Sequence, residues 1–335
     1  MSQLLGLMLI SAFITGVSLI PFIDFLYKIK LRRQKQKTRD IFNKPTPFFD
    51  KYNAWKTGTP FGGGALIIVT VSILTLWAYG LLNIDFKVWQ IFVVLFTLVG
   101  FGALGFYDDF KKLSGKKTGF FGLRFRYKFA IQWILAIIIA LIMYFPLGYS
   151  FIFIKGFGLL PIGLFFIPMA AFVIVSFANA FNIADGLDGQ ASGLLLIALG
   201  AFLIISANQY DKSLGIFIAI LMGSVAAFLY FNIYKARIWL GDVGSLSLGA
   251  SLAVTGLLTG KIIAIGFIGG VFVLEVGSSL LQLIGKRYLG RKILPAAPLH
   301  LWLQARGWEE PKIVMRAWLL GFLFAIMGLY MAFIK

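Results

Sequence analysis

The adjacent acids Asp108 and Asp109 are the first side chains in this sequence that could do chemistry. They lie in the segment GFYDDFKK, at the end of an apolar run and one helical turn before Lys112. Two carboxylates beside cations can be a solvated helix end, and the pattern alone is weak. However, the 335 residues contain only 13 acids, and acids are disfavoured near hydrocarbon. The pair therefore indicates work on a metal ion or a phosphate.

Four polar side chains then recur at every third position of NAFNIADGLDG. They are Asn179, Asn182, Asp185 and Asp188. Where the backbone stays helical, this spacing places them on one stripe of the helix. The two Asp-Gly pairs break the helix and let the chain approach a ligand closely. A structural turn needs only one such residue as a cap, so four of them favour a binding site.

The segment WLGDVGS allows two interpretations. Asp242 and Ser245 could simply start a helix, because both types are good N-caps. A helix N-terminus with glycines is equally suited to bind an anion. Trp239 could stack on a base, although an interfacial tryptophan is the commoner explanation. Asn232 ends the preceding apolar run and adds an amide to this region.

A run of three glycines follows Lys56 in KTGTPFGGG and enters another apolar stretch. The glycines predict either close packing of membrane helices or a phosphate cradle with a lysine beside it. The segment does not match the Walker pattern, so a soluble-type phosphate loop is not supported.

Two further titratable groups stand apart. His300 in PLHLW is the one histidine of the chain and the one side chain here that normally titrates near neutrality, yet a lone histidine is more often structural than catalytic. Glu275 lies well inside an apolar stretch, where an acid is a functional candidate by default. A buried hydrogen-bond network with Ser278 and Gln282 is an equally good explanation for it.

The composition places all these motifs in a membrane protein. Sixty per cent of the residues are hydrophobic and 13% are charged, against about half and a quarter in soluble domains. The absence of cysteine and the single histidine exclude disulfides, thiol catalysis and ordinary zinc, haem or iron–sulfur sites. Any metal must therefore have oxygen ligands.

The hydropathy pattern predicts an all-α integral membrane protein, one domain over residues 1–335 with about ten spans of roughly 20 residues. The first lacks the basic start and cleavage site of a signal peptide, so we expect a retained span. The expected spans lie near 4–27, 62–82, 88–107, 128–147, 158–178, 191–207, 213–232, 244–259, 262–284 and 313–334.

The basic residues predict the orientation. Of 31 Lys and Arg, 26 fall in the segments 28–60, 107–128, 233–243 and 285–316, which the positive-inside rule assigns to the cytoplasm. The other five are Lys87, Lys155, Lys212, Lys261 and Lys335, one in each loop or tail of the opposite face. Both termini are then outside, and the polar motifs meet at the cytoplasmic face. Topology and attraction to anionic membrane lipids explain the net charge of +18 without nucleic acid.

Five aspartates, three asparagines and several lysines on one face suit Mg²⁺ and a diphosphate. Mg²⁺ takes one or two carboxylates and lets substrate phosphates complete its shell, while phosphoryl transfer needs mainly positioning and charge neutralisation. An enzyme of this kind would join a soluble, nucleotide-activated group to a lipid acceptor.

Taken in order, KTGTPFGGG, GFYDDFKK, NAFNIADGLDG, GDVGSLSLG and PLH with RGWEEPKIVMRAW resemble the polyprenyl-phosphate N-acetylhexosamine-1-phosphate transferases, over about residues 56–318. The muramoyl type is the most similar. The resemblance implies Mg²⁺-dependent attack of undecaprenyl phosphate on the β-phosphate of UDP-MurNAc-pentapeptide, in a bacterial plasma membrane, to give the first lipid intermediate of peptidoglycan and UMP. A homodimer is possible.

The resemblance also implies roles for single residues. Asp108 matches the proposed base or nucleophile, but a phosphate monoester is already largely ionised at pH 7, which favours direct attack. The expected catalytic group comprises Asp108, Asp109, Asp242 and His300, with Asp242 and Asp109 as metal ligands. The expected substrate contacts are Lys56, Lys112 and Lys128 for phosphates, Asn182, Asp185 and Asp188 for the nucleotide and ribose, and Asn232 and Trp239 for uracil.

One departure from the family pattern concerns specificity. The muramoyl type carries consecutive histidines where this chain has His300, Leu301 and Trp302. A UDP-GlcNAc transferase of the same superfamily is therefore the main alternative, although KTGTPFGGG and RGWEEPKIVMR are more typical of the muramoyl type. A transporter or a non-catalytic scaffold is a distant alternative, because the acids gather at one face and no repeated halves are visible.

Overall fold

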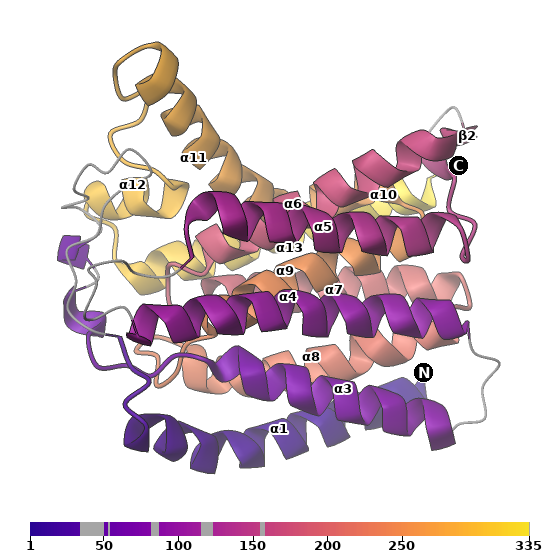
Figure 1. Ribbon diagram of the computed structural model, residues 1–335, viewed down its shortest axis with the longest axis horizontal. Coiled ribbons are helices and arrows are strands. Elements are labelled where there is room, and N and C mark those ends of the chain that lie inside the picture. The colour runs from indigo at the N-terminus through magenta and orange to yellow at the C-terminus, as the bar shows by residue number, and fades with distance from the viewer. Residues whose placement is uncertain (34–49, 53, 82–86, 115–122, 155–157, 335) are drawn as a thin grey trace.

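The computed structural model describes residues 1–33, 50–52, 54–81, 87–114, 123–154 and 158–334, and these form a bundle of long helices (Figure 1). Within these ranges, nine helices are long and apolar enough to cross a membrane, or ten if α10 and α11 are one broken span. The helices are α1 (Ser2–Lys28), α3 (Gly63–Leu81), α4 (Val88–Ser114), α5 (Phe125–Tyr144), α6 (Phe166–Ala184), α7 (Gln190–Asn208), α8 (Lys212–Asn232), α9 (Gly241–Leu258), α10 (Ile262–Ile268), α11 (Gly270–Tyr288), α12 (Leu299–Ala305) and α13 (Glu310–Phe333).

The long helices run alternately up and down, so that the described ends of the chain lie at the same end of the bundle (Figure 1). We call this the terminal end. The opposite end carries α12 and the turn between α6 and α7, and we call it the site end. An even number of crossings requires this arrangement, which agrees with the predicted count of ten.

Two predicted spans differ from the structure. The stretch 158–178 was expected to be one span, but Gly158–Pro161 is strand β2, which pairs antiparallel with β1 (Phe151–Ile154), and α6 starts only at Phe166. The run was apolar enough for either structure, because interfacial strands and membrane helices use the same residue types.

The stretch 262–284 is broken rather than straight. The axes of α10 and α11 differ by 78°, and α11 leaves the bundle at the site end (Figure 1). The break lies at Gly269 and Gly270. A Cβ on Gly269 would lie 2.3 Å from the Phe177 ring and one on Gly270 would lie 2.7 Å from Phe324. Only glycine leaves room there for α6 and α13, a constraint that hydropathy does not contain.

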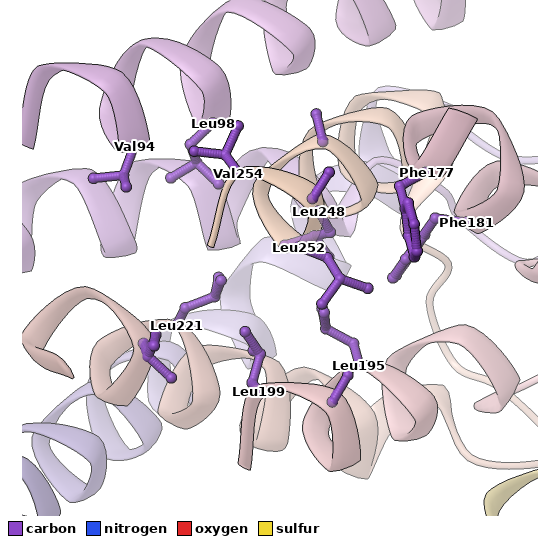
Figure 2. Packing of buried hydrophobic residues seen from close by; sticks show 14 of the residues in the cluster. Val94, Leu98, Phe177, Phe181, Leu195, Leu199, Leu221, Leu248, Leu252 and Val254 are labelled. Atoms are coloured by element: carbon purple, nitrogen blue, oxygen red, sulfur yellow. The ribbon is translucent and has the colours of Figure 1, made fainter. Parts of the chain in front are cut away.

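Helix α9 forms the centre of the bundle. Every residue from Val243 to Leu258 is buried, and its side chains meet those of four neighbouring helices (Figure 2). Figure 2 shows Leu248, Leu252 and Val254 of α9 among Val94 and Leu98 of α4, Phe177 and Phe181 of α6, Leu195 and Leu199 of α7, and Leu221 of α8. Because lipid is as apolar as the core, close packing through small residues holds such helices together.

Glycines set the contacts of α9 at the site end. A Cβ on Gly105 of α4 would lie 2.1 Å from the carbonyl oxygen of Asp242, and one on Gly64 of α3 would lie 2.1 Å from Cα of Gly244. Backbone therefore touches backbone at the place where the polar motifs meet.

We predict that Gly105→Ala separates α4 from α9 and lowers the free energy of unfolding by about 1–3 kcal/mol, the usual cost of overpacking. Gly100→Ala is the matched control, because its Cβ would meet only the flexible Leu135 side chain at 3.5 Å. Thermal unfolding in detergent measures both. Equal midpoints for the two variants would show that the contact at Gly105 can relax.

Candidate functional site

Five charged side chains from three helices form one group at the site end. We call Asp108, Asp109 and Lys112 of α4, Lys128 of α5 and Asp242 of α9 the acid–lysine cluster. Nζ of Lys112 lies 3.3 Å from Asp108 Oδ2, 3.2 Å from Asp109 Oδ1 and 2.8 Å from Asp242 Oδ2. Nζ of Lys128 lies 3.0 Å from Asp108 Oδ2 and also pairs with Asp242. The structure thus brings together five predicted site residues separated by up to 134 positions.

Backbone groups fix the carboxylates of this cluster. The N–H of Val243 donates to Asp109 Oδ2 over 3.1 Å, and the N–H of Leu123 donates to Asp108 Oδ1 over 2.6 Å. Gly241 has a φ of +73°, and a Cβ there would lie 2.6 Å from Asp109 Oδ2. Asp242 lies in the first turn of α9, where the helix dipole favours a negative charge.

The charges of the acid–lysine cluster do not cancel, because three carboxylates face two ammonium groups. The donor set is compatible with Mg²⁺, which needs only one or two carboxylates when phosphates supply the rest. In the described ranges, no three His, Cys, Asp or Glu residues converge to hold a metal by themselves. Asp109 and Asp242, which share Lys112 as a partner, are the pair that fits a metal completed by substrate.

A cavity of about 290 Å³ lies beside the cluster. Six predicted site residues line it, namely Asn182, Asp185, Asp188, Asn232, Trp239 and His300. Asn182 joins the two regions, because its Nδ2 also donates to Asp242 Oδ1 over 3.1 Å and to Ser245 Oγ over 2.6 Å. The three-residue spacing puts Asn182 on the last turn of α6, and the Asp-Gly pairs after it turn the chain around the cavity.

Lys56 lies away from the acid–lysine cluster. It is buried, and its Nζ lies 2.9 Å from Asp188 Oδ1 and 2.6 Å from Glu310 Oε1. Asp188 also accepts hydrogen bonds from the Ala236 N–H and from Nε1 of Trp239. Lys56 and Asp188 therefore hold the wall of the cavity. Glu310 was not predicted, although its position in RGWEEPK, just before a proline at a helix start, marks it as a candidate.

The glycine run after Lys56 is a packing element. The N–H groups of Gly62 and Gly63 donate to the Trp239 carbonyl over 3.1 and 2.9 Å, and that of Gly64 donates to the Leu240 carbonyl over 3.0 Å. Because these donors are used within the protein, the phosphate-cradle interpretation does not hold and the close-packing interpretation does. The run fixes the strand-like approach of Phe61 to Trp239.

The two predicted uracil contacts have different surroundings. Asn232 is buried and fully bonded, since its Oδ1 accepts from the Gly189 N–H and its Nδ2 donates to the Ile238 carbonyl. The Trp239 ring lies against two cations, with the Arg33 guanidinium 5.0 Å and the Lys56 ammonium 5.5 Å from its centre. Both residues line the cavity, but Trp239 is half-buried, whereas Asn232 is buried.

Asp185 is different from the other acids of the site. Its carboxylate lines the cavity and makes no hydrogen bond or ion pair with the part of the chain that the structure describes. Burial raises its pKa well above the usual value, and the negative charges of Asp242 and Asp188 act in the same direction, while Lys56 opposes them. Because burial and the nearby acids disfavour its ionised form, Asp185 costs the protein stability. A carboxylate without described protein partners at the cavity is a candidate to bond a ligand.

We predict that Asp185→Asn raises the unfolding temperature at neutral pH. Below the unfolded-state pKa of about 3.9 both side chains are neutral and the two proteins should unfold alike. Above this pH the aspartate ionises in the unfolded wild type but stays protonated in the folded one. The difference in unfolding temperature between Asp185→Asn and the wild type should therefore increase until the pH passes the raised folded-state pKa. Thermal unfolding between acidic and neutral pH measures this. A variant less stable than the wild type at neutral pH would assign Asp185 a structural role.

Glu275 and His300 form a buried pair at the back of the cavity. Nδ1 of His300 lies 3.0 Å from Glu275 Oε2, and the other carboxylate oxygen accepts from Gln190 Nε2 over 2.9 Å. Both side chains are 2% exposed. On the other side of the ring, a Cβ on Gly186 would lie 2.6 Å from Nε2. Glu275 thus makes Nδ1 the donor and turns Nε2 towards Gly186 and the cavity.

The predicted network of Ser278 and Gln282 has a separate task. Ser278 Oγ accepts from the Leu299 N–H, and Gln282 bonds both the Leu294 N–H and the Leu294 carbonyl. These contacts tie the segment before α12 to α11. The carboxylate of Glu275 therefore bonds Gln190 and His300 rather than the expected Ser278 and Gln282, whose side chains hold the loop.

We predict that Glu275→Leu removes the tautomer preference of His300. Because the chain has one histidine, ¹⁵N-histidine labelling gives a single pair of ring signals. The neutral ring should show a protonated Nδ1 in the wild type and mainly a protonated Nε2 in the variant, since its acceptor is gone. Glu275→Gln keeps an oxygen at the same place and should lie between the two. A wild-type ring protonated at Nε2 would contradict the assignment.

The fold and the site define a polytopic membrane transferase, and comparison with known proteins agrees. The sequence profile of glycosyl transferase family 4 matches residues 91–260. A phospho-N-acetylmuramoyl-pentapeptide-transferase of Borreliella afzelii is 34% identical over 98% of both chains. Relatives of the same name from a Geobacillus species and from Oceanobacillus iheyensis are 34% and 38% identical over 98% and 82% of this chain, covering 98% and 84% of their own length.

The chain therefore belongs to glycosyl transferase family 4 and, within it, to the family of phospho-N-acetylmuramoyl-pentapeptide-transferases. It is an enzyme of the phosphotransferase type, a multi-pass membrane protein, and its relatives place it in peptidoglycan biosynthesis.

Proposed function

We propose that the protein transfers phospho-MurNAc-pentapeptide from UDP-MurNAc-pentapeptide to undecaprenyl phosphate, with Mg²⁺, giving lipid I and UMP. The observation that carries this proposal is Asn182, which lines the cavity and bonds Asp242 of the acid–lysine cluster. A ligand in the cavity would extend directly towards two lysines and three carboxylates. A nucleoside followed by a diphosphate has this sequence of groups.

The residues divide the work by their environment. The cavity takes the nucleoside, with Asp185 free to accept hydrogen bonds from ribose hydroxyls and Trp239 beside the base. Lys112, whose side chain is 33% exposed, and Lys128, at 17%, are the cations that phosphates can reach. Asp109 and Asp242 would hold Mg²⁺, which when bound supplies further neutralisation of the diphosphate. Lys56, Asp188 and Glu310 keep the cavity in shape.

The contacts of Asp108 favour direct attack by the lipid phosphate. Its Oδ1 accepts a hydrogen bond from the Leu123 N–H, and its Oδ2 lies beside both lysines. Both oxygens of Asp108 therefore have partners, so its contacts favour a role in positioning Lys112 and Lys128 over a role as nucleophile. In the proposed step an oxygen of the lipid phosphate bonds to the β-phosphorus. The bond from that phosphorus to the bridging oxygen breaks, and UMP leaves with the electron pair.

We propose that the site end faces the cytoplasm, in the plasma membrane of a bacterium. The described parts of the basic segments, for example at Lys28, Lys112 and Lys235, adjoin this end, which supports the proposal because the positive-inside rule expects basic residues on the cytoplasmic side. A water-soluble nucleotide sugar would reach the cavity from this side, while the lipid acceptor would arrive from the adjoining leaflet.

The first test measures UMP release by the purified protein with undecaprenyl phosphate, in Mg²⁺ or EDTA, with UDP-MurNAc-pentapeptide and UDP-GlcNAc in parallel. We expect turnover with the muramoyl substrate and Mg²⁺ only. Turnover with UDP-GlcNAc alone would favour the alternative suggested by the single histidine of the PLHLW segment. Equal release in EDTA would remove Mg²⁺ from the proposal.

We predict that Asp242→Asn lowers UMP release by at least about 10²-fold, the usual loss when one preorganised charge is removed from a reacting centre. Asp24→Asn makes the same chemical change at an exposed position of α1 and should leave the rate unchanged. Mn²⁺ binding in the presence of UDP-sugar gives a second reading that needs no turnover, and it should weaken in Asp242→Asn alone. A near-normal rate in that variant would take Asp242 out of the mechanism.

A further inference from the structure

A second and larger cavity lies at the terminal end of the bundle, away from the acid–lysine cluster. Its volume is about 1390 Å³, and it is bounded by the starts of α4 and α8, the turns after α5, α7 and α9, and the β1–β2 hairpin. None of the residues assigned to catalysis or to the nucleotide sugar lines it. The enzymatic step therefore gives no account of this cavity.

The described lysines of this face gather on that one cavity. Five lysines of the sequence belong to the sparsely charged face, and the structure describes Lys87, Lys212 and Lys261 of them. All three line the cavity, although they come from three different loops. The membrane topology does not explain why these lysines lie together. The positive-inside rule disfavours lysine on this face and does not predict where the remaining lysines lie relative to one another.

These cations have no carboxylate partners in the described ranges. Asp211 is the one acid that lines the cavity, but its two oxygens accept from the Leu214 N–H over 2.9 Å and from Gln90 Nε2 over 2.8 Å. Lys261 has its ammonium 3.5 Å from the centre of the Phe153 ring, and burial lowers the pKa of its amino group. The lining thus carries an excess of positive charge that the protein leaves uncompensated.

An apolar groove of about 230 Å³ adjoins the charged cavity. The two share Phe153 and Lys261, and the groove continues along Ile263, Ala264 and Met331 of α10 and α13. The charged cavity and the apolar groove meet at Lys261. A phospholipid has the same order of groups, with a charged headgroup followed by an acyl chain. Exposed aromatic side chains of the lining, Trp89 and Tyr210, are typical of the headgroup level of a membrane.

We infer that this cavity binds an anionic glycerophospholipid of the leaflet at the terminal end, with its phosphate among Lys87, Lys212 and Lys261 and an acyl chain in the groove along Ile263 and Met331. A net negative headgroup such as phosphatidylglycerol complements the three cations. Phosphatidylcholine carries its own cation and does not. The bound lipid joins the α7–α8 and α9–α10 turns, and through α9 the terminal end is connected to Asp242.

The test is retention of labelled phosphatidylglycerol. The protein is reconstituted in phosphatidylcholine nanodiscs with a minor fraction of labelled phosphatidylglycerol and extracted in mild detergent, and the label that remains per chain is counted. The triple variant Lys87→Gln, Lys212→Gln and Lys261→Gln should retain about tenfold less, since each lysine near a lipid surface contributes substantially to anionic binding. A control that removes three exposed charges at the site end, Lys28→Gln, Lys235→Gln and Lys292→Gln, should retain nearly the wild-type amount.

A second variant tests the groove without changing any charge. Met331→Trp should fill it and reduce the retained phosphatidylglycerol several-fold, while soluble glycerophosphoglycerol should fail to displace the lipid. Elution profile and unfolding temperature in lipid-free detergent show that each variant is folded. Equal losses in the two triple variants would mean non-specific charge attraction. Full displacement by the soluble headgroup, or no effect of Met331→Trp, would mean a site for a free anion. Each of these results would overturn the inference.

Discussion

Most of this structure depends on the contact between α9 and its neighbours at the site end. Two ammonium and three carboxylate groups can lie at the edge of a membrane only if each finds a partner, because an unpaired charge there is costly. The partners come from α4, α5 and α9, and they meet because Gly105 and Gly64 let backbones touch. The glycines are therefore as much a part of the site as the aspartates.

The contact between α9 and its neighbours also connects the cavity with the acid–lysine cluster. Asn182 at the end of α6 bonds the first turn of α9, so the cavity lined by Asn182 and Asp185 and the acid–lysine cluster share a wall. Around the cavity, acids that are paired and acids that are free have separate tasks. Asp188 is bonded on both oxygens by Lys56, Trp239 and backbone, whereas the carboxylate of Asp185 has no hydrogen bond or ion pair with the described residues. In the proposed function, a ligand that bonds Asp185 would offset the cost of burying this acid.

The structure brings together residues that sequence reasoning named, but the protein partners of some of them were not predicted. Lys56 was expected beside phosphates because a glycine run follows it, yet it pairs with Asp188 and Glu310. The sequence indicates that a buried lysine needs an anionic partner, but it does not indicate whether that partner is a phosphate or a carboxylate of the protein. Likewise the role of Glu275 stayed open until His300, 25 residues away, was placed on its carboxylate. Pair partners distant in the chain leave no local pattern.

The sequence by itself determined the class of protein, a count of about ten apolar spans, of which the described structure shows nine or ten, the gathering of the polar motifs at one end of the bundle, and the family. Each of these follows from local quantities: hydropathy over about 20 residues, the count of basic residues in each loop, and motifs of fewer than a dozen positions. Only the tertiary structure decided that α10 and α11 bend by 78°, that the glycine run packs on Trp239, and that three lysines of separate loops share one cavity. These features depend on which helices touch, and in a membrane that choice is made by the fit of surfaces rather than by hydrophobicity.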